Sequence, residues 1–391
     1  MRLQLSPEDA AFREEMRTFF TTQVPQGIRD AVAERRELSK EQIVEAQRVL
    51  NAAGLAVPHW PAEWGGKGWT QLQKHLWHEE MLQACVPPPL SFNTNMVGPV
   101  IATFGSDELK ERFLAPTANL DIWWSQGFSE PDAGSDLASL RTSAVRDGDE
   151  WVVNGQKTWT TLGQYGDWIF CLVRTDPDAP KRQQGISFLL IDMTSPGVTV
   201  RPIELIDGGV EVNEVWFEDV RVPADQLVGE ENKGWTYAKF LLGNERVGVA
   251  PVASTKRLLA QAKERAQEKL ADGSTLLEDP LLAARFAELE NEVLALELTA
   301  LRVAANSAGD KPHPASSVLK LKGTELQQAV TEIVVDVAGP ASLASGAPDG
   351  SDVPHWARVA TPQYLNYRKA SIYGGSNEVQ RSIIASSILG L

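Results

Sequence analysis

The 391-residue sequence contains little cysteine, no excess of positive charge and no long apolar segment. Its two cysteines, Cys85 and Cys171, are too few for a disulfide framework, which favours a reducing compartment. A net charge of −15 argues against nucleic acid and anionic membranes as partners, because both bind basic surfaces. No apolar run reaches the ~20 residues that span a bilayer, and the acidic N-terminus lacks an apolar signal segment. These features predict a cytoplasmic location.

Residue types change along the chain in a way that predicts three domains. A hydrophobic content of 43% is ordinary for a globular protein and supplies ample core-forming residues. Residues 1–118 are expected to form an N-terminal helical domain, residues 119–228 a central β-domain and residues 229–391 a C-terminal helical bundle. Helices before and after a block of strands indicate the α+β class rather than a Rossmann unit. The expected architecture is a compact antiparallel β-barrel or sandwich between an N-terminal helical domain and a C-terminal four-helix bundle.

Local signals predict where several helices begin and end. Ser6 before Pro7 is a good N-cap, and Ser376 would cap a last helix that begins near Asn377. Pro251 should kink or break the helix predicted over residues 235–271, because it removes a donor and clashes one turn back. The other helices expected from the apolar periodicity cover residues 41–50, 71–83, 280–306 and 315–337.

Residues 123–161 form the most informative block. Its first half contains the loop GFSEPDAGSD (residues 127–136), whose N–H groups and hydroxyls suit carbonyl or phosphate ligands. Asn154-Gly155, between two apolar runs, predicts a tight hairpin turn. Trp159 and Thr161 follow on the outgoing strand, two residues apart and therefore on one face. The pattern is typical of a platform for an aromatic cofactor, with an ordinary β-sheet and polar turn as the alternative.

Four motifs in order resemble the acyl-CoA dehydrogenase family: SEPDAGSD, NGQKTWTT, EVWFEDVRVPADQLVGEENKGW and YGGSNEVQR. The resemblance covers essentially the whole chain, and finer details are similar to the large subunit of pimeloyl-CoA dehydrogenases. It implies a flavoprotein of acyl-chain oxidation that desaturates an acyl-CoA thioester. FAD would lie between a central β-domain and two helical domains, and electrons would leave to an electron-transfer flavoprotein.

The resemblance also implies which residues contact the cofactor and the substrate. The Phe128 backbone and the Ser129 hydroxyl would meet the pyrimidine edge of the flavin ring. Trp159 would lie beside its dimethylbenzene side, and Thr161 would hydrogen-bond N5. The other residues implied as FAD contacts are Gly134, Ser135, Thr160, Gly375, Ser376 and Glu378. Acyl-CoA would be contacted by Ser135, Arg246 and Tyr373.

The catalytic base is expected at Glu245. Many family members carry this base in a Tyr-Glu-Gly turn near the C-terminus, but the turn here reads Tyr373-Gly374-Gly375. A subset of the family carries it on the long helix as Glu followed by Arg, which Glu245-Arg246 matches. Burial beside an apolar ring and acyl chain would raise the pKa of this Glu toward the operating pH. Gly374 would polarise the thioester carbonyl through its backbone N–H, and the β-hydride would go to flavin N5. The alternative is an inactive enzyme.

The sequence also bears on assembly and leaves alternatives open. Family homo-oligomers use an Arg…Phe-Gly motif to grip the FAD pyrophosphate of a neighbouring subunit, and the matching residues 269–273 (KLADG) lack the Arg and the Phe. A second, related subunit is therefore expected, with a weakly FAD-binding homodimer as the alternative. An acyl-CoA oxidase or related flavin enzyme, and a non-catalytic scaffold subunit, remain alternative functions. The acyl group stays open among dicarboxylyl, medium- or long-chain, branched and steroid side-chain thioesters. His75 and His78 do not form a zinc signature, so no metal is expected.

Overall fold

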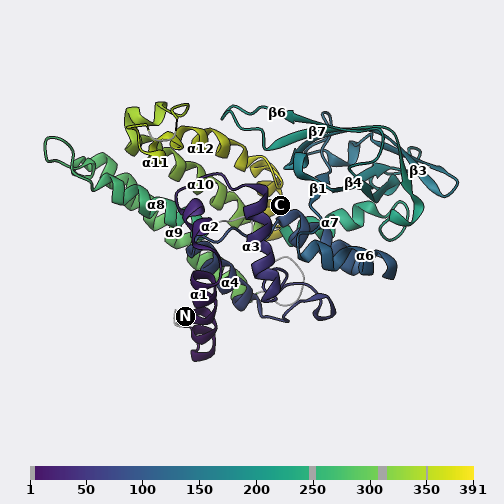
Figure 1. Ribbon diagram of the computed structural model, residues 1–391, viewed down its shortest axis with the longest axis horizontal. Helices are drawn as coiled ribbons and strands as arrows, with labels where there is room; N and C mark the ends of the chain where they lie inside the picture. Colours follow the sequence, from purple (N-terminus) through teal and green to yellow (C-terminus); the bar gives the residue numbers. More distant parts are fainter. Residues whose placement is uncertain (1–4, 246–251, 307–314, 349–350) are drawn as a thin grey trace. The chain divides into compact units, whose positions relative to one another are not determined.

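The computed structural model describes residues 5–245, 252–306, 315–348 and 351–391 (Figure 1). Contacts divide the chain into two units. The helical unit comprises Met1–Leu38, Trp69–Pro87 and Arg246–Leu391. The sheet unit comprises Ser39–Gly68 and Pro88–Glu245. The N-terminal helical region thus contributes helices to both units.

The helical unit consists of helices and short 3₁₀ turns. Its helices are α1 (Pro7–Thr22), α2 (Gln26–Ala33), α4 (Gln71–Gln83), α8 (Val252–Ala266), α9 (Pro280–Asn306), α10 (Ser316–Ala338), α11 (His355–Arg358), α12 (Ala360–Asn366) and α13 (Asn377–Ile384). The predicted caps are confirmed, because the Ser6 hydroxyl accepts from the Asp9 N–H and the Ser376 hydroxyl accepts from the Val379 N–H. Pro251 lies outside the described residues. Among those that are described, no helix has the length and apolar character needed to cross a membrane.

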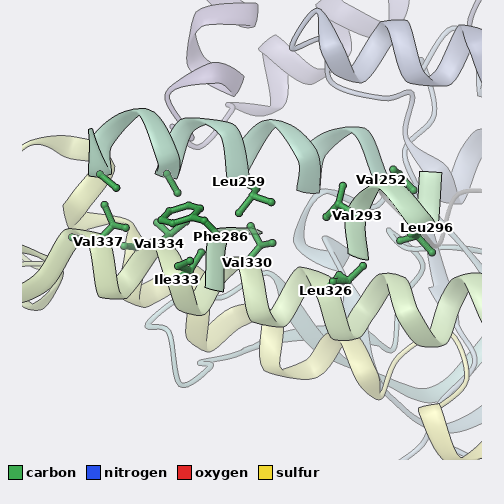
Figure 2. Close-up of a cluster of buried hydrophobic side chains, with 14 of the residues drawn as sticks. Val252, Leu259, Phe286, Val293, Leu296, Leu326, Val330, Ile333, Val334 and Val337 are labelled. Atoms are coloured by element: carbon green, nitrogen blue, oxygen red, sulfur yellow. The ribbon is translucent and has the colours of Figure 1, made fainter. Parts of the chain in front are cut away.

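The core of the helical unit lies between α8, α9 and α10. Buried positions on α10 recur at Leu326, Val330, Ile333, Val334 and Val337, the spacing of one helix face. Figure 2 shows these side chains pointing toward those of α8 and α9. Apolar periodicity therefore determines which face of each long helix is buried.

A buried carboxylate connects α1 to α4 in the helical unit. Glu80 on α4 is 3% exposed, and its two oxygens accept from the Arg13 side chain at 2.5 Å and from the Arg17 side chain at 2.9 Å. Two arginines satisfy the charge that burial would otherwise penalise. The predicted helix over residues 71–83 coincides with α4, whereas α2 was not predicted.

The sheet unit is built around one seven-stranded sheet. Its strands are β1 (Trp124–Gly127), β2 (Ser143–Asp147), β3 (Glu150–Thr161), β4 (Trp168–Arg174), β5 (Ile186–Asp192), β6 (Val198–Ile203) and β7 (Val212–Pro223). The strand order is β1-β4-β2-β3-β7-β6, with β5 paired to β4. Pairing is antiparallel except where β4 meets β1 and β2. The sheet is mixed, not purely antiparallel as expected.

Helices complete the sheet unit. They are α3 (Lys40–Ala52), a π-helical turn (Phe92–Val97), α5 (Gly98–Phe104), α6 (Asp107–Ala118) and α7 (Gly234–Glu245). α7 packs against β5 and against the π-helical turn. The predicted helix over residues 41–50 corresponds to α3, which is longer because Ser39 and Gln42 form a capping box.

The predicted hairpin turn at Asn154-Gly155 is wrong. These residues lie inside β3, and the pairing with β7 shifts register between Val153 and Gly155. The Asn154 side chain exchanges two hydrogen bonds of 2.9 Å with Asp219, one to its N–H and one to its carboxylate. The turn between β2 and β3 instead uses Gly148, whose φ is +63°. A glycine signal for a turn therefore marks a bulge in the middle of a long strand.

Candidate functional site

The loop that follows β1 has a well-defined turn at its centre. Glu130 and Ala133 exchange two backbone hydrogen bonds of 3.0 Å, and Pro131 occupies the second position of this turn. Beyond the turn, Gly134 and Ser135 are exposed. The loop therefore presents its small and hydroxyl residues outward from a fixed base.

The second part of the predicted platform is at the end of β3. Trp159 is 57% exposed, Thr160 is buried and Thr161 is half-buried, so Trp159 and Thr161 lie on the same side of the strand. The strand is not regular there, because pairing with β7 shifts register between Lys157 and Thr160. Trp159 has a φ of +60°, a conformation that costs a bulky residue about 1–2 kcal/mol. A large, exposed aromatic ring held in a strained backbone is a functional-site signal.

Several hydroxyl groups of this region have no hydrogen-bond partner among the described residues. Within the described part of the chain, the side chains of Ser129 and Thr161 make no hydrogen bond, and the buried Thr160 Oγ1 has none either. A flat ring with polar edges would supply both a face for Trp159 and acceptors or donors for hydroxyls. This donor set fits the isoalloxazine ring of FAD.

An ion pair lies beneath the loop and was missed by sequence reasoning. Lys157 on β3 is fully buried, and its Nζ donates to Glu130 Oε1 at 2.7 Å and to the Phe128 carbonyl at 3.2 Å. Burial by itself would raise the pKa of Glu130, but the Lys157 charge and the hydrogen bonds from Lys157, Thr142 and Arg141 lower it overall. The only signal in the sequence was a Lys two residues before the Trp of NGQKTWTT.

The C-terminal turn of the helical unit carries the other predicted contacts. Gly374 and Gly375 have φ values of +63° and +83°, so both need the left-handed conformation that glycine tolerates. Tyr373, before them, is 48% exposed. The Ser376 hydroxyl caps α13, and hydrogen bonds at this helix start, first from the backbone and then from Ser376, lower the pKa of Glu378.

A second buried lysine supports this turn and was also missed. Lys320 on α10 is 1% exposed, and its Nζ donates to the Ala370 carbonyl at 3.3 Å and to Asn377 Oδ1 at 3.1 Å. The Thr324 hydroxyl donates to the same Asn377 oxygen at 3.2 Å. The two glycines are thus bracketed by residues that α10 holds in place.

The predicted base lies at the end of a helix of the sheet unit. Glu245 is the last residue of α7, the helix that packs against β5. Its backbone therefore belongs to the same unit as Trp159 and Thr161. Arg246 lies outside the described residues.

Comparison with known proteins decides the family. The N-terminal, middle and C-terminal domains of acyl-CoA dehydrogenases match residues 6–121, 125–220 and 232–389 of the chain. The chain is also 38% identical over 344 residues to the acyl-CoA dehydrogenase IpdE1 of Mycobacterium tuberculosis, covering 88% of this chain and 86% of that protein. The chain belongs to the acyl-CoA dehydrogenase family.

Solved structures agree with this assignment. One chain of the ChsE4-ChsE5 complex from M. tuberculosis has a TM-score of 0.85 at 34% identity, with 100% of this chain and 99% of that chain covered. A chain of the Tcur3481-Tcur3483 steroid acyl-CoA dehydrogenase also has a TM-score of 0.85, at 29% identity and the same coverage. This acyl-CoA dehydrogenase is accordingly an FAD-dependent oxidoreductase with the predicted fold. The narrower resemblance to pimeloyl-CoA dehydrogenase subunits stays a prediction.

Proposed function

We propose that this acyl-CoA dehydrogenase desaturates its thioester between the α and β carbons, with Glu245 as the base that removes the α proton. The observation that carries the proposal is the turn at Tyr373-Gly374-Gly375, where two glycines with positive φ leave no carboxylate. Removing an α proton needs a group whose pKa lies near the working pH, and a carboxylate in apolar surroundings meets that requirement. Glu245 ends a helix of the unit that also carries the ring platform.

The other predicted site residues would bind and orient the cofactor and the thioester. Bound FAD would supply the acceptor for the hydride that leaves the β carbon. Trp159 would cover one part of the ring, and the Ser129 and Thr161 hydroxyls would fix its polar edges. The Gly374 N–H would donate to the thioester carbonyl, which stabilises the negative charge that develops when the α proton leaves. Contacts of Ser135 and Arg246 with the CoA portion remain predictions.

Replacement of the base tests the proposal. Glu245→Gln should bind FAD with an unchanged absorbance spectrum but bleach it at least ~100-fold more slowly when acyl-CoA is added without oxygen, the usual range for a lost general base. The matched control is Glu231→Gln, because Glu231 is an exposed carboxylate just before α7. If Glu245→Gln bleaches the flavin at the wild-type rate, Glu245 is not the base. If neither variant nor wild type bleaches it with any thioester, the chain is a scaffold subunit.

The acyl group is proposed to be a bulky, ring-bearing thioester of the steroid side-chain type. This rests on the similarity to a steroid acyl-CoA dehydrogenase at 29% identity over the whole chain. A panel of steroid side-chain, dicarboxylyl, branched and long-chain acyl-CoA esters, compared by kcat/KM, would test it. If a dicarboxylyl ester instead gives the highest kcat/KM, the result would favour the hypothesis that the enzyme resembles pimeloyl-CoA dehydrogenases in its substrate.

The assembly is proposed to contain a second, related subunit, in a cytoplasmic enzyme that passes its electrons to an electron-transfer flavoprotein. Residues 269–273 lack the Arg and the Phe expected of a self-sufficient FAD site, and one similar structure is a complex of two differently named subunits. Co-purification with a related co-encoded dehydrogenase, together with the FAD content per protomer, tests the assembly. A homodimer with one FAD per chain would refute it. Rapid reoxidation of the bleached flavin in air would favour an oxidase.

A further inference from the structure

The ion pair between Lys157 and Glu130 is unusual because it is almost completely buried. Lys157 exposes none of its surface and Glu130 exposes 7% of its surface. Taking two charges out of water is costly, so a buried pair is weak evidence for a role in stability alone. Apolar residues of similar volume would pack the same space at less cost. The pair therefore calls for a reason beyond filling the core.

The contacts of the pair all converge on the loop after β1. Glu130 accepts from the Arg141 N–H at 2.6 Å and from the Thr142 N–H at 2.9 Å, in addition to Lys157 at 2.7 Å. Lys157 also donates to the Phe128 carbonyl at 3.2 Å. These bonds tie Phe128 and Glu130 to Lys157 on β3, and they tie Glu130 to the far end of the same loop.

The same point of β3 is the start of the irregular segment that carries Trp159. The Thr158 N–H donates to the Ser129 carbonyl at 2.9 Å, so the residue after Lys157 is also bonded to the loop. One residue further, Trp159 adopts its positive φ. Lys157 and Thr158 together thus fix the position of the loop relative to the exposed Trp159 side chain.

We propose that Lys157 and Glu130 form a positioning pair. The pair fixes the backbone of Phe128 and Ser129 at a defined distance from Trp159, so that the loop can contact the pyrimidine edge of the flavin ring while Trp159 contacts its dimethylbenzene side. The proposal rests on the proposed role of these three residues in binding the ring. Neither member of the pair touches the ring or the reacting atoms. Both act through the loop.

Measuring FAD affinity and unfolding temperature in the same variants distinguishes a positioning role of the pair from a purely stabilising one. Lys157→Met removes the donor to the Phe128 carbonyl and should weaken FAD binding to the apo-protein about 10- to 100-fold, as measured by flavin fluorescence below the unfolding temperature. The matched control is Val153→Ala, because Val153 is a buried residue of the same strand and belongs to the apolar core of the sheet unit. It should lower the unfolding temperature while leaving the FAD dissociation constant within about twofold of wild type.

The charge of the pair provides a readout that a purely structural role would not change. Glu130→Gln leaves the Lys157 cation without its partner and should shift the midpoint potential of bound FAD to a more positive value. Lys157→Met removes that cation and should not shift it in the positive direction, because charge near the ring tunes its electronics. The double variant leaves no buried charge, so it should recover part of the lost unfolding temperature without recovering FAD affinity.

The outcomes are distinct. If wild-type apo-protein does not bind FAD, alone or with its partner subunit, the proposed function of the platform fails. If wild type binds FAD and Lys157→Met binds it equally well, the positioning role alone is refuted. Recovery of FAD affinity in parallel with unfolding temperature in the double variant would show that the pair only stabilises the fold.

Discussion

Trp159→Gly should weaken cofactor binding considerably more than it destabilises the fold. Trp159 exposes 57% of its surface, which for a Trp side chain of ~250 Å² leaves ~140 Å² for a ligand to cover. At about 25 cal/mol per Å², this area corresponds to at most ~3.5 kcal/mol, or ~300-fold in FAD affinity. The remaining ~110 Å² contributes ~2.7 kcal/mol to folding of the apo-protein. Glycine at this φ of +60° relieves about 1–2 kcal/mol of strain, so the net loss of stability should be only ~0.7–1.7 kcal/mol.

Trp151 provides the matched control because it lies on the same strand but is 2% exposed. Trp151→Ala should cost about 3–5 kcal/mol of unfolding free energy, and the milder Trp151→Phe should bind FAD as wild type does. The assays are urea unfolding of the apo-proteins and fluorescence titration with FAD. The reasoning is refuted if Trp159→Gly binds FAD within twofold of wild type, or if it loses as much stability as Trp151→Ala.

Substitutions at three further positions test other parts of the structure. Burial, and next the charge of Glu297, raise the pKa of Glu79 to about 7. The contribution of this carboxyl to stability is therefore fully present below its unfolded pKa of about 4.5. It is lost as the pH rises through the folded pKa of about 7. Glu79→Gln should therefore raise the unfolding free energy by about 1–3 kcal/mol at pH 8 and leave it unchanged at pH 4, and an equal effect at both pH values would contradict the assignment. Gly155→Ala should cost about 2 kcal/mol or more in urea unfolding, because a Cβ there would lie 2.6 Å from Thr142 Cα. A substitution at Gly148 in the turn, where nothing lies within 4 Å, should cost less.

Local sequence signals predicted helix ends well where the deciding contacts are themselves local. The caps at Ser6 and Ser376 and both ends of α4 agree with the structure, because a capping hydroxyl bonds an N–H only three residues away. α5 and α6 were not predicted as separate helices. Pro99 lies in the first turn of α5, whereas Pro116 lies inside α6, so a proline by itself does not show where a helix begins.

In the candidate site, too, the sequence predicted what local residue spacing decides but not what contacts between distant segments decide. Trp159 and Thr161 were predicted from their spacing, and the structure adds that the strand bulges so that both lie outward of the buried Thr160. Lys157 would be read as a solvent-facing residue from sequence, since lysine is rarely buried without a partner. Its partner, Glu130, is 27 residues away and reaches it only through the folded sheet.

The sequence by itself determined the family, the cofactor and the absence of a carboxylate at Gly374, because each depends on residue identity at a recognisable motif. Tertiary structure alone decided that Asn154-Gly155 lies in a strand, since the Asn154 side chain is satisfied by Asp219, 65 residues away. It also decided that Lys157 is buried and that Trp159 is strained and exposed. These properties arise from contacts between distant segments, whose energies no local pattern of residues contains.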